Sequence, residues 1–167
     1  MWNVRNPRVG WVSSLTFQSN NANIACATYL SVGSTHVGRS TDGGNSWLPR
    51  DGTGTGALPD VSVHSLVIGP NAPDWNYLGT DLEVSVSPDA GVTWAVENSG
   101  FANVIVERLA LRSPAAVGAP PQLHAFSDGR KIWMIALDFA GTPDYRMGTE
   151  ITGLWFDPMQ DGQGLNL

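Results

Sequence analysis

Short apolar stretches separated by turn residues, rather than long helical periodicities, make up most of this chain. Three of them have a similar pattern and begin with valine: Val12–Phe17, Val63–Ile68 and Val106–Leu111. A turn rich in Pro, Asn or Ser follows each one, and then a second short stretch, at Ala25–Tyr29, Tyr77–Thr80 and Leu123–Ser127. Short apolar runs bounded by such turns are typical of β-strands. The pattern therefore predicts two consecutive strands at the start of each of three repeated units.

A third strand and a polar fourth strand complete each predicted unit. The third strands are expected at His36–Ser40 and Val84–Ser87, with Lys131–Leu137 as a degenerate member. The fourth strands begin at Trp47 and Trp94, and Trp2 opens a further copy near the N-terminus. Four strands in about 45 residues match one blade of a β-propeller. We therefore predict an all-β chain of four-stranded antiparallel propeller blades that form an incomplete ring of about three blades.

The most specific signal is an octad that occurs twice, 47 residues apart, with the pattern S-x-D-x-G-x-[ST]-W. Its identical positions are Ser40, Asp42, Gly44 and Trp47 in the first copy and Ser87, Asp89, Gly91 and Trp94 in the second. The aspartate can accept backbone N–H groups, the glycine allows a positive φ, and the indole supplies apolar area for burial. We therefore expect a structural hairpin turn between the third and fourth strands. A calcium loop of the EF-hand type is not favoured, because neither copy has a Glu at the twelfth position.

Both octads resemble the Asp-box, or BNR repeat, of sialidases, sortilin-type receptors and xyloglucanase-type glycoside hydrolases. The resemblance covers roughly residues 1–138 and implies a propeller in which these hairpins lie away from the ligand face. The stretches Leu58–Leu66, Tyr77–Trp94 and Leu123–Trp133 resemble the last blades of secreted bacterial propellers. The resemblance thus implies a secreted, periplasmic or cell-envelope location, although no signal peptide is visible in this sequence.

The sequence divides into a propeller segment, 1–138, with blades at roughly 1–50, 51–98 and 99–138, followed by a linker, 139–152. Residues 153–167 resemble the start of a truncated C-terminal β-rich motif. So few blades cannot close a ring, which needs at least about four. We expect a fragment of a larger propeller, in which further blades complete the ring; self-association and an open arc are the alternatives.

Composition excludes several other classes of partner and site. The net charge is −6, from nine Lys plus Arg against fifteen Asp plus Glu, which argues against nucleic acid or an anionic membrane as partner. No apolar run is long enough for membrane insertion. Cys26 is the single cysteine and is expected to be a small buried residue. The three histidines fall one per blade without ligand spacing, so we expect ordinary strand residues, no metal site and no cofactor.

Candidate chemistry is limited to carboxylates at strand ends, because a glycoside hydrolase needs two of them beside the sugar. Asp60, Asp81, Glu83 and Asp128 lie at such ends. Of these, Asp81 and Asp128 follow the second strands of successive blades and are the catalytic candidates. The arginine triad and the nucleophilic tyrosine that resemblance to a sialidase would require are not assembled.

Two tryptophans outside the octads, Trp11 and Trp75, could stack on a sugar, but packing is the favoured interpretation. The sequence therefore predicts a non-catalytic scaffold, or a module that binds a glycan or a protein ligand, within a larger secreted protein. The alternative is part of a xyloglucanase-like or sialidase-like glycoside hydrolase, with its acid and base split between this chain and a missing part.

Overall fold

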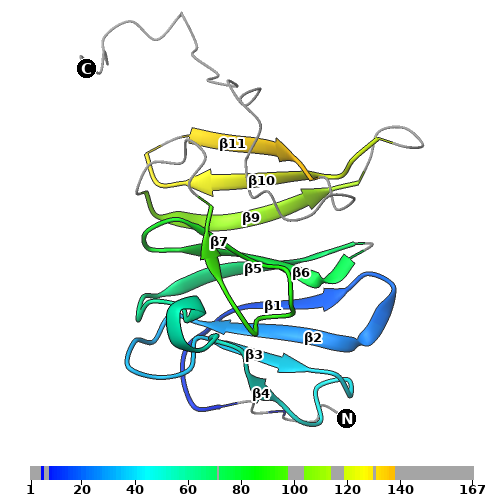
Figure 1. Ribbon diagram of the computed structural model, residues 1–167, viewed down its shortest axis with the longest axis vertical. Helices are drawn as coiled ribbons and strands as arrows, with labels where there is room; N and C mark the ends of the chain where they lie inside the picture. Colours follow the sequence, from blue (N-terminus) through cyan, green and yellow to red (C-terminus); the bar gives the residue numbers. More distant parts are fainter. Residues whose placement is uncertain are drawn as a thin grey trace, which may run out of the picture.

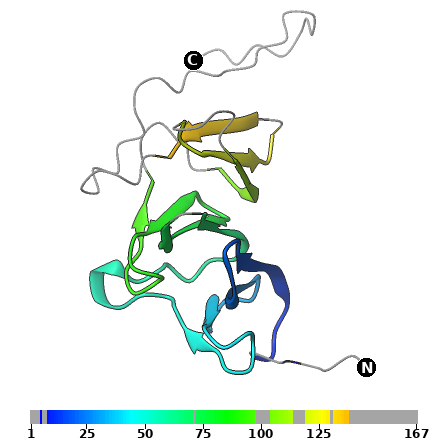
Figure 2. The ribbon, with the colours of Figure 1, turned by 90° about the vertical axis from the view of Figure 1, so that its right-hand side faces the viewer.

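The computed structural model describes residues 5, 8–70, 72–97, 104–113, 119–129 and 131–137. Within these ranges the strands form three antiparallel sheets, which are stacked in chain order along the long axis of the molecule (Figures 1 and 2). A single 3₁₀ turn, Gly54–Gly56, interrupts the connection between the first and second sheets. The prediction of an all-β fold built from antiparallel blades in an incomplete ring is confirmed.

Each sheet follows the simplest up-and-down order of its strands. Sheet A consists of β1 (Val12–Gln18), β2 (Asn21–Tyr29), β3 (Val37–Ser40) and β4 (Leu48–Pro49). Sheet B repeats this order with β5 (Val63–Gly69), β6 (Ala72–Thr80), β7 (Val84–Ser87) and β8 (Ala95–Val96). Sheet C has three described strands, β9 (Val106–Arg112), β10 (Gln122–Ser127) and β11 (Lys131–Ala136). The strand expected after Trp2, the linker 139–152 and the motif 153–167 lie outside the described residues.

Strand register shows that the three sheets are copies of one unit. Leu15 lies opposite Ala27 in sheet A, as Leu66 lies opposite Leu78 in sheet B. The two hairpins also share irregularities at the same two places, just after the first residue of the first strand and just before its last. In sheet C, Leu109 takes the position of Leu66. Equivalent residues can therefore be compared from one sheet to the next.

The core consists of two apolar layers, one between sheets A and B and one between sheets B and C. Successive side chains of a strand point to opposite faces, so Leu66 and Ile68 of β5 pack toward sheet A, whereas Val67 packs toward sheet C. Cys26 is buried in the first layer, as the sequence predicted. Gly79 allows β9 to approach closely, because a Cβ at this position would lie 2.6 Å from the carbonyl oxygen of Val106.

Hydrogen bonds between first strands fix how the sheets stack. The hydroxyl of Ser13 donates to the carbonyl oxygen of Val63 at 2.5 Å, and that of Thr16 donates to Leu66 at 2.6 Å. At the next layer the backbone N–H of Leu109 donates to the hydroxyl oxygen of Ser65 at 3.1 Å. Strands β1, β5 and β9 therefore lie next to one another, where the innermost strands of successive propeller blades belong.

The octads form tight turns between the third and fourth strands. In the first, Asp42 accepts the backbone N–H of Ser46 at 2.9 Å, its hydroxyl at 2.6 Å, and the hydroxyl of Ser40 at 2.8 Å. The backbone N–H of Gly44 donates to Ser40 Oγ at 2.8 Å, with φ at +86°. Equivalent bonds in the second octad join Asp89 to Ser87 and Thr93, and join Gly91, with φ at +84°, to Ser87.

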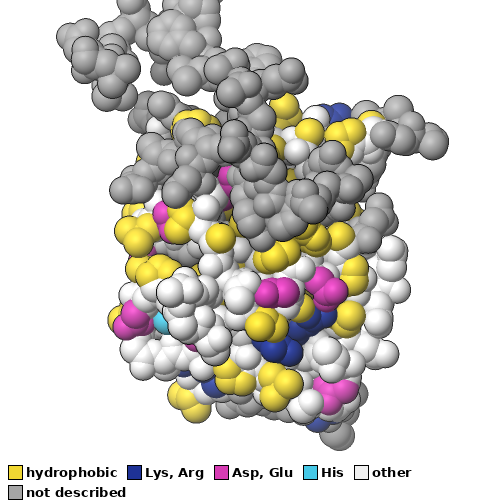
Figure 3. All heavy atoms as spheres, in the orientation of Figure 1, with side chains coloured by type: hydrophobic (Ala, Val, Ile, Leu, Met, Phe, Trp, Pro, Cys, Tyr) yellow, Lys and Arg dark blue, Asp and Glu magenta, His cyan; other side chains and the backbone are white. Residues whose placement is uncertain are grey.

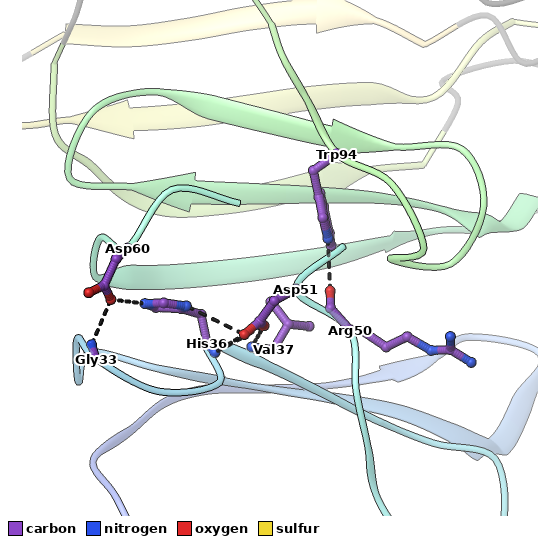
Figure 4. Close-up of polar contacts among 7 residues, drawn as sticks. All are labelled: Gly33, His36, Val37, Arg50, Asp51, Asp60 and Trp94. Atoms are coloured by element: carbon purple, nitrogen blue, oxygen red, sulfur yellow. Dashed lines mark hydrogen bonds and ion pairs between the residues drawn. The ribbon is translucent and has the colours of Figure 1, made fainter. Parts of the chain in front are cut away.

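The two octad tryptophans differ in what they hold together. The indole N–H of Trp94 donates to the carbonyl oxygen of Arg50 at 2.8 Å, in the connection that leaves sheet A (Figure 4). The backbone N–H of Trp94 donates to Gly56 in the same connection at 2.8 Å. Trp47 instead donates to Gly44 of its own turn at 3.1 Å and is only half-buried. The second octad thus ties two sheets together, whereas the first closes its own turn.

This difference predicts unequal losses on truncation of the two indoles. We expect Trp94→Ala to lower the free energy of unfolding by about 3–5 kcal/mol, because a buried ring and a bond between sheets are lost. Trp47→Ala should cost clearly less, because that ring is partly in water. Urea unfolding followed by far-UV circular dichroism measures both values, and equal losses would contradict the assigned roles.

The octad carboxylates also predict a dependence of stability on acid. Hydrogen bonds from Ser46 hold the pKa of Asp42 at about 2. Partial burial raises the pKa of Asp89, but hydrogen bonds from Thr93, Ser87 and Val92 together outweigh it, so the pKa lies below its ordinary value. A carboxyl group with a lowered pKa in the folded state contributes stability above its ordinary pKa, and this contribution is lost as the pH falls toward the folded value.

We therefore expect Asp42→Asn to be less stable than the parent at pH 7, with the difference shrinking as the pH falls from about 4 to about 2. Thermal unfolding across this range measures the effect. Glu107→Gln, a change at an exposed residue of β9, is the matched control. A constant gap between Asp42→Asn and the parent would disprove the linkage.

Candidate functional site

One edge of the sheet stack gathers the loops between second and third strands and the connections that lead into the first strands. Its repeated feature is a backbone bond from the residue after the second strand to the residue before, or at the start of, the first strand. Asp81 N–H donates to Ser62 at 3.2 Å, and Asp128 N–H donates to Ile105 at 3.0 Å. The octad turns are held instead at the opposite edge, as when Gly43 N–H donates to the Asn23 carbonyl. We call the first edge, formed by Trp11, His64 and residues 30–36, 51, 60–62, 80–83 and 128, the loop rim.

His36 lies buried at the loop rim between two carboxylates (Figure 4). Its Nε2 is 3.0 Å from Asp60 Oδ1, and its Nδ1 is 3.6 Å from Asp51 Oδ2. Asp51 also accepts the backbone N–H groups of His36 and Val37, at 2.9 and 2.7 Å. Asp60 accepts the backbone N–H of Gly33 at 2.6 Å. The cluster therefore fixes the loop of sheet A to the connection that enters sheet B.

A second pair joins His64 of β5 to Asp81 of the β6–β7 turn, with 2.6 Å between Nε2 and Oδ1. Partial burial raises the pKa of Asp81, but hydrogen bonds from Ser62 and His64 outweigh it and hold the pKa below its ordinary value. Asp81 is therefore ionised at neutral pH. Two residues further on, burial raises the pKa of Glu83. At the left edge of Figure 3, acidic side chains gather beside a histidine.

The catalytic candidates Asp81 and Asp128 occupy equivalent places in sheets B and C, but no contact brings their side chains together among the described residues. Asp128 is exposed at the β10–β11 turn. Among all the residues that the structure describes, no group of three or more His, Cys, Asp or Glu side chains is arranged to hold a metal ion.

Sequence reasoning missed the pairings of the histidines at this rim. It predicted His36 and His64 as ordinary strand residues and gave Asp51 no role. His64 does lie in β5 and is half-buried, whereas His36 precedes β3, and the pairing of neither histidine was predicted. A signal for one pair was present, because pairing Val63 with Thr80 in the hairpin places His64 beside Asp81. The pairs of His36 depend on two connections that fold back across the rim, and no strand pattern encodes them.

Trp11 also differs from its expected packing role. Its side chain is 74% exposed at the loop rim, where its carbonyl oxygen accepts the N–H of Leu30 at 3.1 Å. Trp75, by contrast, packs against the layer between sheets B and C, as expected. The rim therefore combines an open indole with fixed carboxylates and imidazoles.

Among the described residues no helix has the length and apolar character needed to cross a membrane.

No protein-family model matches this sequence, and no curated protein matches it. Solved structures with a similar fold include GH74 enzymes. The Niastella koreensis GH74 enzyme aligns with a TM-score of 0.54 at 15% identity, over 73% of this chain and 19% of that one. An ancestral GH74 enzyme aligns with a TM-score of 0.53 at 18% identity, over 82% of this chain and 20% of that one. The GH74 xyloglucanase from Xanthomonas campestris aligns with a TM-score of 0.53 at 15% identity, over 73% of this chain and 20% of that one. The chain thus spans about a fifth of these enzymes' length, and the likeness establishes a propeller-type fold.

The geometry at Asp81 predicts a coupling that can be measured directly. Replacing His64 by Leu removes a hydrogen bond and a nearby source of positive charge, so the pKa of Asp81 should rise toward its ordinary value or above it. Carboxyl ¹³C chemical shifts followed through an acid titration report this change. His124→Leu, on β10, is the matched control. An unchanged Asp81 titration in the His64→Leu variant would show that the pair does not form in solution.

Proposed function

We propose that this chain is a segment of a non-catalytic, Asp-box β-propeller that binds a glycan at its loop rim, as a module of a larger secreted protein. The observation that carries the proposal is the exposed indole of Trp11 at an edge that also holds Asp60, Asp81 and His64. The octad geometry supports the Asp-box assignment, and the resemblance of the sequence to secreted propellers supports the location.

The rim offers the chemistry that a sugar ring needs. An indole face packs against the C–H groups of a pyranose, while carboxylates accept its hydroxyl protons. Asp60 and Asp81 are each oriented by a histidine, so their positions are set before a ligand arrives. Pre-set polar groups lower the ordering cost of binding. An edge with an exposed stacking ring and a few fixed acceptors suits recognition of a carbohydrate surface.

The state of the carboxylates favours binding over cleavage. Glycoside hydrolysis needs one carboxylic acid and one carboxylate on either side of the scissile bond, about 5–9.5 Å apart. Asp81 is held ionised by its hydrogen bonds, and Asp60 is bonded to both His36 and Gly33. Glu83, whose pKa is raised, belongs to the same short turn as Asp81 rather than to a facing element. These features support an acceptor surface without a complete acid–base pair.

The second candidate function is part of a glycoside hydrolase, and two observations favour it. Solved structures with a similar fold are GH74 enzymes, and the pKa values of Asp81 and Glu83 are shifted in opposite directions, as in acid–base pairs. Because the chain spans about a fifth of those enzymes, the facing carboxylate would come from elsewhere in a complete propeller.

Glycan-array binding, followed by calorimetry with the best polysaccharide, tests the proposal. We expect binding without release of reducing sugar. Trp11→Ala should weaken the affinity tenfold or more, about 1.4 kcal/mol. Val92→Ala, which alters an exposed apolar residue of the second octad turn at the opposite edge, should bind like the parent.

Three outcomes would overturn this assignment. Hydrolysis that is abolished by Asp81→Asn would establish the enzyme instead. Affinity for peptides with indifference to sugars would make the rim a protein-binding surface. Glycan binding that Trp11→Ala leaves intact would place the site elsewhere on the chain.

A further inference from the structure

The outward face of sheet A exposes apolar residues whose equivalents in sheet B are buried. Leu15 of β1 is 55% exposed, whereas Leu66, at the same register position of β5, is 1% exposed against sheet A. Phe17 is likewise exposed and its equivalent Ile68 buried. The outward face of sheet A therefore exposes an apolar surface equivalent to the one that sheet B buries against sheet A.

Sheet C shows the complementary case at the other end of the stack. Ile132 of β11 is 55% exposed, whereas Val84, at the same register position of β7, is completely buried beneath sheet C. Met134 is exposed in the same way, although its equivalent Val86 is buried. Phe126 stands where sheet B has Gly79, so an exposed aromatic ring adds to the apolar area of this face.

The polar ties differ between the two contacts, because Leu109 N–H bonds the Ser65 hydroxyl between sheets B and C, whereas hydroxyl groups and an indole join sheets A and B. The carbonyl oxygens of Val63 and Leu66 accept hydroxyl groups from sheet A, and the Trp94 indole bonds the connection that leaves sheet A. Trp47, at the equivalent position in sheet A, bonds its own turn. Both ends of the stack thus carry one half of an apolar layer that is built twice inside the chain.

We propose that the occupant of these faces is a second copy of this chain, packed head to tail, so that self-association of two such segments completes one propeller. Sheet C of one copy then covers Leu15 and Phe17 of the other, while the second copy's sheet C covers the same face of the first. Two copies contribute six sheets, which lies within the four to eight blades of closed propellers. A twofold axis through the centre of the ring, perpendicular to its plane, makes the two contacts identical. The assembly therefore closes instead of growing into a filament.

Light scattering coupled to size exclusion tests this on the 167-residue chain. We expect a mass twice the chain mass of 17.8 kDa. Leu15→Glu and Ile132→Glu should each give folded monomers, as judged by circular dichroism, because each places a charge in the buried contact. Val92→Glu, at an exposed apolar residue of the second octad turn, is the matched control and should remain a dimer. Phe17→Lys and Met134→Lys form a second pair, should either glutamate variant fail to fold.

Mixing the variants distinguishes this arrangement from a symmetric contact between like faces. Leu15→Glu retains an intact sheet C, and Ile132→Glu retains an intact sheet A, so an equimolar mixture should recover a dimer through one unaltered contact. A parent chain that stays monomeric at concentrations up to about 0.1 mM overturns the proposal, because protein contacts of specific size bind more tightly than that. So does a dimer that only one of the two glutamate substitutions disrupts.

Discussion

Strand β5 sends Leu66 and Val67 to opposite faces, and the stack of sheets depends on that alternation. A sheet of four short strands cannot protect both of its faces alone, so each interior sheet must be apolar on both sides. Sheet B meets this condition, with one layer against Cys26 and Val37 and another against Leu109 and Leu123. The end sheets meet it on one side only. The hydroxyl bonds from Ser13 and Thr16 add direction to this non-directional packing, because they align β1 with β5.

Much of the fold was predictable because it is encoded over short distances. The start of β5 at Val63 and the start of β7 at Val84 follow from apolar runs between turns, and the octads mark the last turn of two blades. The first residues of the second strands were harder to predict from the sequence. Strand β2 begins at Asn21, four residues earlier than expected, because its exposed polar residues continue the hairpin in a solvated part of the sheet that apolar patterning does not register.

The rim was less predictable for a different physical reason. His36 and Asp60 are 24 residues apart and meet only after the connection from sheet A has turned back toward sheet B. Trp11 has the large apolar side chain typical of a core residue, yet its position before the first strand leaves it exposed to solvent. Composition and strand period define which faces are apolar, but the side chains at the ends of strands depend on how several loops meet.

The connection between β4 and β5 is held at several points by residues of different sheets. Trp94 bonds the backbone of Arg50 and Gly56, Asp51 caps the start of β3, and Asp60 meets His36. In repeat proteins the stability of the array is approximately a sum of intrinsic terms for each unit and nearest-neighbour coupling terms. Here much of that coupling is concentrated in one short crossover segment. Sheets A and B should therefore melt as a single cooperative unit, even though each has the strand order of an independent module.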